Sequence, residues 1–298
     1  MILSRAATAL ALAVCLAPRP ADGWGFDAHR FITERAVERL PAEIRPFFEK
    51  HKGFFVEHSI DPDLWRTAGF AEEPPRHYLD LDAYGAHPFD ELSREYEAAL
   101  LKWGREMIEK NGTLPWRTSE VYGDLVRAFA AQKEPSPRWG TDRIVFHAAV
   151  LSHYTADAHV PLHAILNYDG QHTGQHGVHA RFESDLFTRH RDRLRLERIE
   201  LAPIADPRDF VFDTLLASFE LAAPVLEADR RALGTGVEYD DAYYARFWSG
   251  AGDILQGRLA RAIGAVAAMI AGAWEQAGRP ALPAQARPPV ERKRGARP

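Results

Sequence analysis

Cysteine is almost absent from this chain of 298 residues, which contains a single one, Cys15. It lies in a segment that we expect to be removed from the mature protein, which would then have neither a thiolate nor a disulfide. This excludes a cysteine nucleophile and a cysteine-bound zinc site. Three hydrolase motifs are also missing: the G-x-S-x-G nucleophile elbow, H-E-x-x-H, and a phosphate-binding glycine loop.

Long apolar runs are scarce as well. The clearest one extends from Ala6 to Leu16, after Arg5 and before Ala21-Asp22-Gly23. Its small residues at the −3 and −1 positions are typical of a cleaved secretory signal. The run is too short to span a membrane, and we expect no transmembrane segment in the mature chain. The sequence therefore predicts a signal peptide over residues 1–23 and a secreted or periplasmic protein.

Positive charge is concentrated at the two ends of the chain. The net charge is −5, yet the segment from Arg279 to Pro298 has six basic residues and one acidic residue. Without this tail and the leader, whose net charge is +1, residues 24–278 carry a net charge of −11. A negatively charged domain disfavours an extended electrostatic interface with nucleic acid and suits a protein whose carboxylates bind cations. The tail, residues 279–298, is rich in proline and arginine, and we expect it to be disordered.

Convincing alternating strand patterns are absent, whereas apolar residues recur at helical spacing. Residues 24–278 are therefore predicted to form one all-α domain. Two stretches, 57–82 and 161–177, are predicted to be loops that carry functional groups. The predicted helices lie near residues 27–40, 90–110, 118–133, 141–158, 179–196, 206–228 and 240–277.

Histidine and acidic residues are paired at helical spacing in two places. His153 and Asp157 are four residues apart, as are His179 and Glu183, so each pair shares one helical face. His163 lies between the two pairs. One such pair is usually a surface hydrogen bond, but imidazole and carboxylate groups in this number suit zinc in a hydrolytic site. Upstream lie further candidates: His29, Asp61, Asp63 and His77.

Trp24 becomes a candidate ligand if the leader is cut after Gly23. Its free α-amino group and its own carbonyl can then chelate one metal ion. The simpler interpretation is that Trp24 is an aromatic core residue. The remaining histidines are assigned surface or supporting roles. His172 and His176 are the least safely excluded of these because they are close to His179.

The ordered set of these residues resembles the superfamily that joins zinc-dependent phospholipase C to the secreted single-strand nucleases of the P-one/S-one type. The resemblance covers residues 24–183 and rests on Trp24-x4-His29, Asp63, His77, His153-x3-Asp157, Pro161-Leu162-His163 and His179-x3-Glu183. It implies a multi-helix, single-domain, all-α fold with three zinc ions in one cleft.

The resemblance also implies a ligand set for each ion. Asp63, His77, His153 and Asp157 would hold the first ion. Trp24, His29 and the same Asp157 would hold the second, so that Asp157 bridges two ions. His163, His179 and Glu183 would hold the third. Asp61 competes with Asp63, which we prefer because it is closer in sequence to His77.

The implied reaction is hydrolysis of a phosphodiester by a water bound between two ions. Asp157 would bridge these ions, and Asp63 would orient or deprotonate the water. We expect a monomer without a stable protein partner. A non-catalytic zinc-binding protein is an alternative from another functional class.

The chain has residues typical of two branches of the superfamily, and these branches hydrolyse different phosphodiesters. Arg66 would clamp phosphate, Tyr78 would stack on a base and Asp80 would bind the edge of that base, as in a nuclease. The alternative is that Arg66 pairs with a nearby acid and that Tyr78 belongs to the core. Glu183 as the last ligand resembles the phospholipase branch, whereas Leu64 and Pro74 replace aromatic residues of that branch. The sequence gives a slight preference for single-stranded nucleic acid or 3′-nucleotides, with a phospholipid as the alternative.

Overall fold

The computed structural model describes residues 24–132 and 140–283, so the predicted signal peptide and most of the predicted tail lie outside the described residues. Within this part, helices and short helical turns form all the regular structure, which confirms the all-α prediction. The longer helices are α1 (Phe26–Val37), α7 (Leu114–Ala130), α8 (Gly140–Asp157), α11 (Pro207–Leu233) and α12 (Asp241–Gln276). The shorter ones are α2 (Arg45–Lys50), α3 (Lys52–Glu57), α4 (Asp61–Thr67), α5 (Tyr96–Trp103), α6 (Arg105–Asn111), α9 (Val178–Ala180) and α10 (Leu186–His190).

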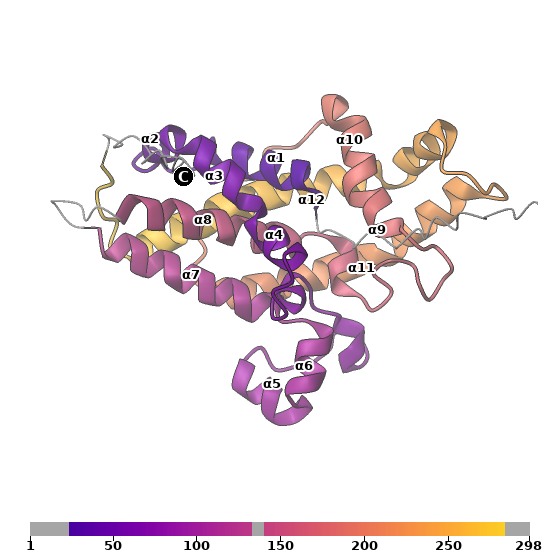
Figure 1. Cartoon of the computed structure of the whole chain (residues 1–298), viewed down its shortest axis with the longest axis horizontal. Helices are drawn as coiled ribbons and strands as arrows, with labels where there is room; N and C mark the ends of the chain where they lie inside the picture. The colour runs from indigo at the N-terminus through magenta and orange to yellow at the C-terminus, as the bar shows by residue number, and fades with distance from the viewer. Residues whose placement is uncertain (1–23, 133–139, 284–298) are drawn as a thin grey trace, which may run out of the picture.

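The helix α12 forms the centre of the bundle, and α1, α7, α8 and α11 pack against it (Figure 1). By length and composition alone, α12 is long and apolar enough to cross a membrane. However, 78% of its apolar window is buried inside the protein. A helix that is apolar on all sides and covered by other helices is typical of the core of a large domain.

The two C-terminal helices begin where the sequence predicts, because each has an aspartate cap. The Asp206 carboxylate accepts a hydrogen bond from the Asp209 amide at 3.0 Å, and Asp240 accepts one from the Tyr243 amide at 2.7 Å. These caps satisfy amides of the first turn that have no partner within the helix. Gly272 of α12 allows the segment before α11 to pack closely against this helix, since a Cβ there would lie 1.9 Å from the Ile204 carbonyl oxygen.

Several predicted boundaries are wrong. The predicted helix 90–110 is two helices, α5 and α6, separated at Gly104, whose φ of +78° ends a right-handed helix. The predicted helix 179–196 ends at His190, with only a short 3₁₀ turn beyond it. The predicted loop 57–82 contains α4, and the chain before it forms α2 and α3. Helices of six or seven residues are too short to show a periodic apolar pattern.

Candidate metal centre

The structure brings eight of the nine predicted ligands into one buried cluster. They come from α1, α4 and α8, from the 3₁₀ turns Pro74–His77 and Pro161–Ala164, and from the chain around α9. Each is at most 4% exposed. They fall into three groups whose potential ligand atoms lie within 4.8 Å of one another: His29, His153 and Asp157; Asp63, His77 and His153; and His163, His179 and Glu183.

Asp157, at the C-terminal end of α8, lies between two of these groups. Its Oδ2 atom is 3.0 Å from His77 Nδ1 and 3.2 Å from His153 Nε2. Its Oδ1 atom points to the other side and is 3.3 Å from His29 Nε2. One carboxylate thus presents its two oxygens to two different sets of histidines, which is the arrangement that a bridging ligand needs.

The third group is built on the turn after α9. His179 Nε2 is 2.8 Å from Glu183 Oε1 and 3.2 Å from His163 Nε2. Residues Arg181–Asp185 form a π-helical turn, a feature often found at functional sites. Arg181 anchors this turn, because its guanidinium pairs with the buried Asp229 of α11 at 2.9 Å and donates to the His176 carbonyl at 2.7 Å.

The orientation of two histidine rings fits metal binding. His153 Nδ1 donates a hydrogen bond to the Ser59 carbonyl at 2.9 Å, and His163 Nδ1 donates one to the His77 carbonyl at 2.7 Å. In the neutral ring this leaves Nε2 as a lone pair that faces the other ligand atoms. Converging lone pairs repel each other unless a cation lies between them. A hydrogen bond from the second ring nitrogen is also the usual partner of a metal-binding histidine.

Other atoms of the cluster also fit a bound cation. In a tetrahedral zinc site with bonds of 2.0–2.1 Å, neighbouring ligand atoms are about 3.3 Å apart, close to the separations observed here. Buried polar atoms without a hydrogen-bond partner are costly, and many of those among the described residues belong to this cluster. Those that face the other ligand atoms include His29 Nε2, Asp63 Oδ2, Asp157 Oδ1 and Glu183 Oε2.

Backbone hydrogen bonds fix the segment that carries His77. The Asp80 amide donates to the Asn111 carbonyl at 2.8 Å, and the Leu79 amide donates to the His163 carbonyl at 2.9 Å. Gly112 lies against this segment with a φ of +99°, and a Cβ there would be 2.0 Å from the Tyr78 carbonyl oxygen. The Asn111-Gly112 pair, which follows the predicted helix 90–110, therefore helps to position the predicted ligand His77.

Glu73 is a supporting residue that the sequence-based prediction missed. It is 1% exposed, and its Oε1 atom is 3.6 Å from His77 Nε2, the ring nitrogen that faces away from Asp157. It also accepts hydrogen bonds from the Tyr154 hydroxyl and from Arg76. Burial alone would raise the pKa of Glu73, but its interactions with His77, Tyr154 and Arg76 lower that pKa to about 2. Glu73 and His77 are four residues apart, the same spacing as the other pairs.

We expect Glu73→Gln to weaken zinc binding by about 10- to 100-fold, the usual effect of losing a carboxylate that orients a metal-binding histidine. Competition with a fluorescent chelator measures this affinity. Glu72→Gln is the matched control, because Glu72 is exposed and lies one residue away. Equal zinc affinity in the Glu73 variant and the control would show that Glu73 does not orient His77.

The structure distinguishes the two candidate aspartates of α4. Asp63 is fully buried, with Oδ1 3.8 Å from His77 Nδ1 and 3.0 Å from Arg66 Nη2. Asp61 instead lies 2.7 Å from His58 Nδ1 and belongs to none of the three groups. Arg66 thus contacts an acid, as the simpler interpretation of the sequence has it, at the edge of the cluster.

Of the other two predicted substrate contacts, Tyr78 is hydrogen-bonded within the protein and Asp80 is buried. The Tyr78 hydroxyl donates to the Lys110 carbonyl at 3.1 Å. Asp80 is 5% exposed, and burial together with Asp82 raises its pKa to about 7. His172 and His176, the two least safely excluded histidines, are exposed and lie outside the three groups.

Trp24 lies beside the cluster as a buried side chain. Its indole Nε1 donates to the carbonyl of Ala156, the residue before Asp157, at 2.9 Å. The next residue, Gly25, lines a cavity of about 240 Å³ together with Glu183. The first described residues therefore lie close to Asp157 and Glu183, while coordination through the Trp24 amine stays a prediction.

Comparison with known families gives one match. The family described as zinc-dependent phospholipase C matches residues 28–216, which include every predicted ligand except Trp24. A search of curated proteins gives no match.

Proposed function

The chain belongs to the zinc-dependent phospholipase C family, and we propose that it hydrolyses a phosphodiester of phospholipid type at the buried histidine and carboxylate cluster. Membership of this family implies a zinc-dependent phosphoric-ester hydrolase. The choice of a phospholipid is our inference from the surroundings of the cluster.

Exposed apolar side chains beside the ligands carry this inference. Leu64, which directly follows Asp63, is 43% exposed. Tyr168 is 44% exposed, and its ring centre is 6.0 Å from that of His179. Apolar surface at the edge of a polar cluster suits a substrate that joins a phosphate to apolar chains. The acidic body of the protein, in contrast, disfavours a long polyanion.

We further propose that the cluster holds three zinc ions with the ligand sets that the resemblance implies. When bound, zinc would neutralise phosphate charge and lower the pKa of a water molecule towards neutrality. Asp63 would accept a proton from that water, because its carboxylate lies at the edge of the cluster. Arg66 would orient this carboxylate through the 3.0 Å contact between Nη2 and Oδ1.

Single-stranded nucleic acid or a 3′-nucleotide is the second candidate substrate. Arg66 favours it, since this guanidinium is 16% exposed at the edge of the cluster and could contact a phosphate. Tyr78 and Asp80 support it less, because the Tyr78 hydroxyl is bonded to Lys110 and Asp80 is buried. For either substrate we propose a monomer that is secreted or periplasmic and whose leader is removed before Trp24.

A substrate panel tests this proposal. We expect the mature, zinc-loaded protein to hydrolyse phosphatidylcholine and a generic aryl phosphodiester faster than single-stranded DNA, RNA or 3′-mononucleotides. Hydrolysis confined to the nucleic-acid substrates would contradict the phospholipid assignment. Tight zinc binding without hydrolysis of any of them would instead identify a non-catalytic zinc-binding protein.

A further inference from the structure

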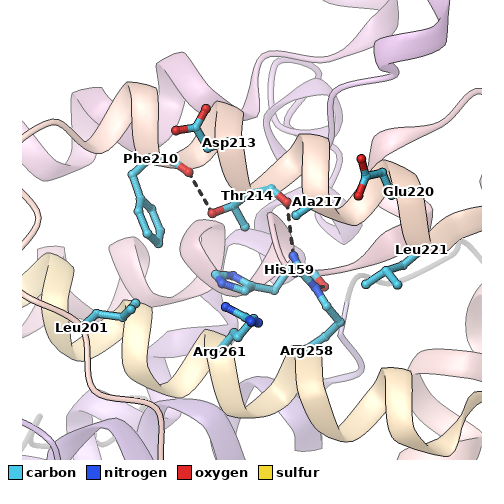
Figure 2. Close-up of a pocket in the computed structure, with 10 residues that line it drawn as sticks. All are labelled: His159, Leu201, Phe210, Asp213, Thr214, Ala217, Glu220, Leu221, Arg258 and Arg261. Carbon is cyan, nitrogen blue, oxygen red and sulfur yellow. Dashed lines mark hydrogen bonds between the residues drawn. The ribbon is translucent and has the colours of Figure 1, made fainter. Parts of the chain in front are cut away.

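A second site of interest is a cavity of about 440 Å³ between α11, α12 and the end of α8, built from none of the predicted metal ligands (Figure 2). Its walls are largely apolar, and Arg258 and Arg261 of α12 project into it beside the His159 ring. The apolar part consists of Leu201, Phe210, Ala217 and Leu221.

Arg258 is a buried guanidinium without a carboxylate partner among the described residues. It is 4% exposed, and its Nε donates to the His159 carbonyl at 2.8 Å. Its Nη2 donates to Ser218 Oγ at 2.6 Å and to the Thr214 carbonyl at 3.2 Å. All these acceptors are neutral, and Nη1 makes no hydrogen bond to the described part of the chain. A buried charge without a counter-charge is costly for the folded state.

Arg261 adds a second positive charge to the same cavity. It lies three residues after Arg258, so both side chains are on one face of α12. Burial, and then the charge of Arg261, lower the pKa of Arg258 to about 10. Arg258 nevertheless stays protonated at neutral pH, so the two guanidinium groups repel each other across the cavity.

The two acidic residues at the edge of the cavity leave this charge uncompensated. Asp213 Oδ1 pairs with Arg94 Nη2 at 2.6 Å, and Glu220 Oε1 lies 3.8 Å from His87 Nε2. Figure 2 shows both carboxylates pointing away from Arg258 and Arg261. The cavity therefore combines an apolar wall with positive charge that the surrounding protein does not neutralise.

We propose that this cavity binds an oxyanion that carries a short apolar chain, a ligand class beyond the phosphodiester substrate of the metal centre. Arg258 Nη1 and Arg261 would hold the anionic head by charge-assisted hydrogen bonds. Phe210, Leu201 and Leu221 would cover the chain. The three hydrogen bonds that fix Arg258 orient its guanidinium in advance, which reduces the entropy lost on binding.

Calorimetry with hexyl phosphate, heptanoate, inorganic phosphate and hexanol tests the proposal. Because phosphate and carboxylate also suit the metal centre, the titrations use the mature protein and its His179→Ala variant. We expect hexyl phosphate, heptanoate or both to bind in both proteins, and at least about tenfold more tightly than inorganic phosphate or hexanol. The tighter of the two identifies the preferred head group. Binding of neither in the His179 variant, or equal binding of inorganic phosphate, would overturn the proposal.

Substitutions then place the ligand. Arg261→Gln, at an exposed position, is expected to weaken this binding about tenfold, the usual effect of losing a charge-assisted hydrogen bond. Arg195→Gln removes the same charge from another exposed site and should leave the affinity unchanged. Ala217→Trp should fill the apolar side of the cavity and exclude the ligand's chain. Arg258 itself is left unchanged, because its hydrogen bonds support the fold. Unchanged affinity in both Arg261→Gln and Ala217→Trp would show that the ligand binds elsewhere. Phospholipid hydrolysis is scored separately, so failure here leaves the proposed function standing.

Discussion

Asp157→Asn is expected to abolish hydrolysis and to reduce the zinc content of the protein. The two carboxylate oxygens face different histidines, so one substitution alters two of the three groups. An amide keeps the size of the side chain but removes its negative charge. Residues that only orient a ligand contribute about 10- to 100-fold, so a ligand shared by two ions should lower kcat/KM by more than about 100-fold. Elemental analysis and phosphodiester hydrolysis measure the two effects.

Asp61→Asn is the matched control for this variant. Asp61 contacts His58 and lies outside the cluster, so its substitution should leave zinc content and rate nearly unchanged. Circular dichroism confirms that both variants are folded before they are compared. Full zinc content and a normal rate in the Asp157 variant would refute its role as the bridging ligand.

Retention of residues before Trp24 is expected to lower both zinc affinity and hydrolysis. In an extended chain the nitrogen of Trp24 is an amide, whose lone pair is delocalised and cannot bind a metal ion. We expect one ion to bind at least about tenfold more weakly, by analogy with other losses at metal sites. The comparison uses one protein that begins at Trp24 and one that begins at Ala21.

The same three residues added after Pro298 provide the control, because they lengthen the chain without blocking the Trp24 amine. This control should match the mature protein in zinc content and in rate. If the protein that begins at Ala21 performs as well as the one that begins at Trp24, the α-amino group is not a ligand.

The sequence singles out candidate ligands that the structure brings together, because their chemistry has a local signature. The pairs His153–Asp157 and His179–Glu183 each share one helical face, and the structure brings both into the cluster. Glu73–His77 has the same spacing, but it lies in a stretch predicted as a loop, where helical spacing has no meaning. The acceptor of His153, the Ser59 carbonyl, leaves no signal in the sequence, because any residue supplies a carbonyl.

For the fold, too, features with a local sequence signal are predicted and features that depend on tertiary contacts are not. The sequence predicts the long helices α8, α11 and α12 to within a few residues, apart from the later end of α11, because a buried face marks all three and an aspartate cap begins α11 and α12. The short helix α4 was missed, since seven residues complete only about two turns. The close approach of the Tyr78 carbonyl to Gly112 is a tertiary contact, which composition and periodicity do not encode.

The most direct test of the metal centre measures zinc content and phosphodiester hydrolysis on the same mature protein. Samples are compared as purified, after removal of metal with a chelator, and after zinc is added back. We expect about three zinc ions per chain, loss of hydrolysis when they are removed, and recovery of the rate as zinc returns. Hydrolysis that persists at its full rate in the metal-free protein would contradict a zinc-dependent centre built from His29, Asp157 and their neighbours.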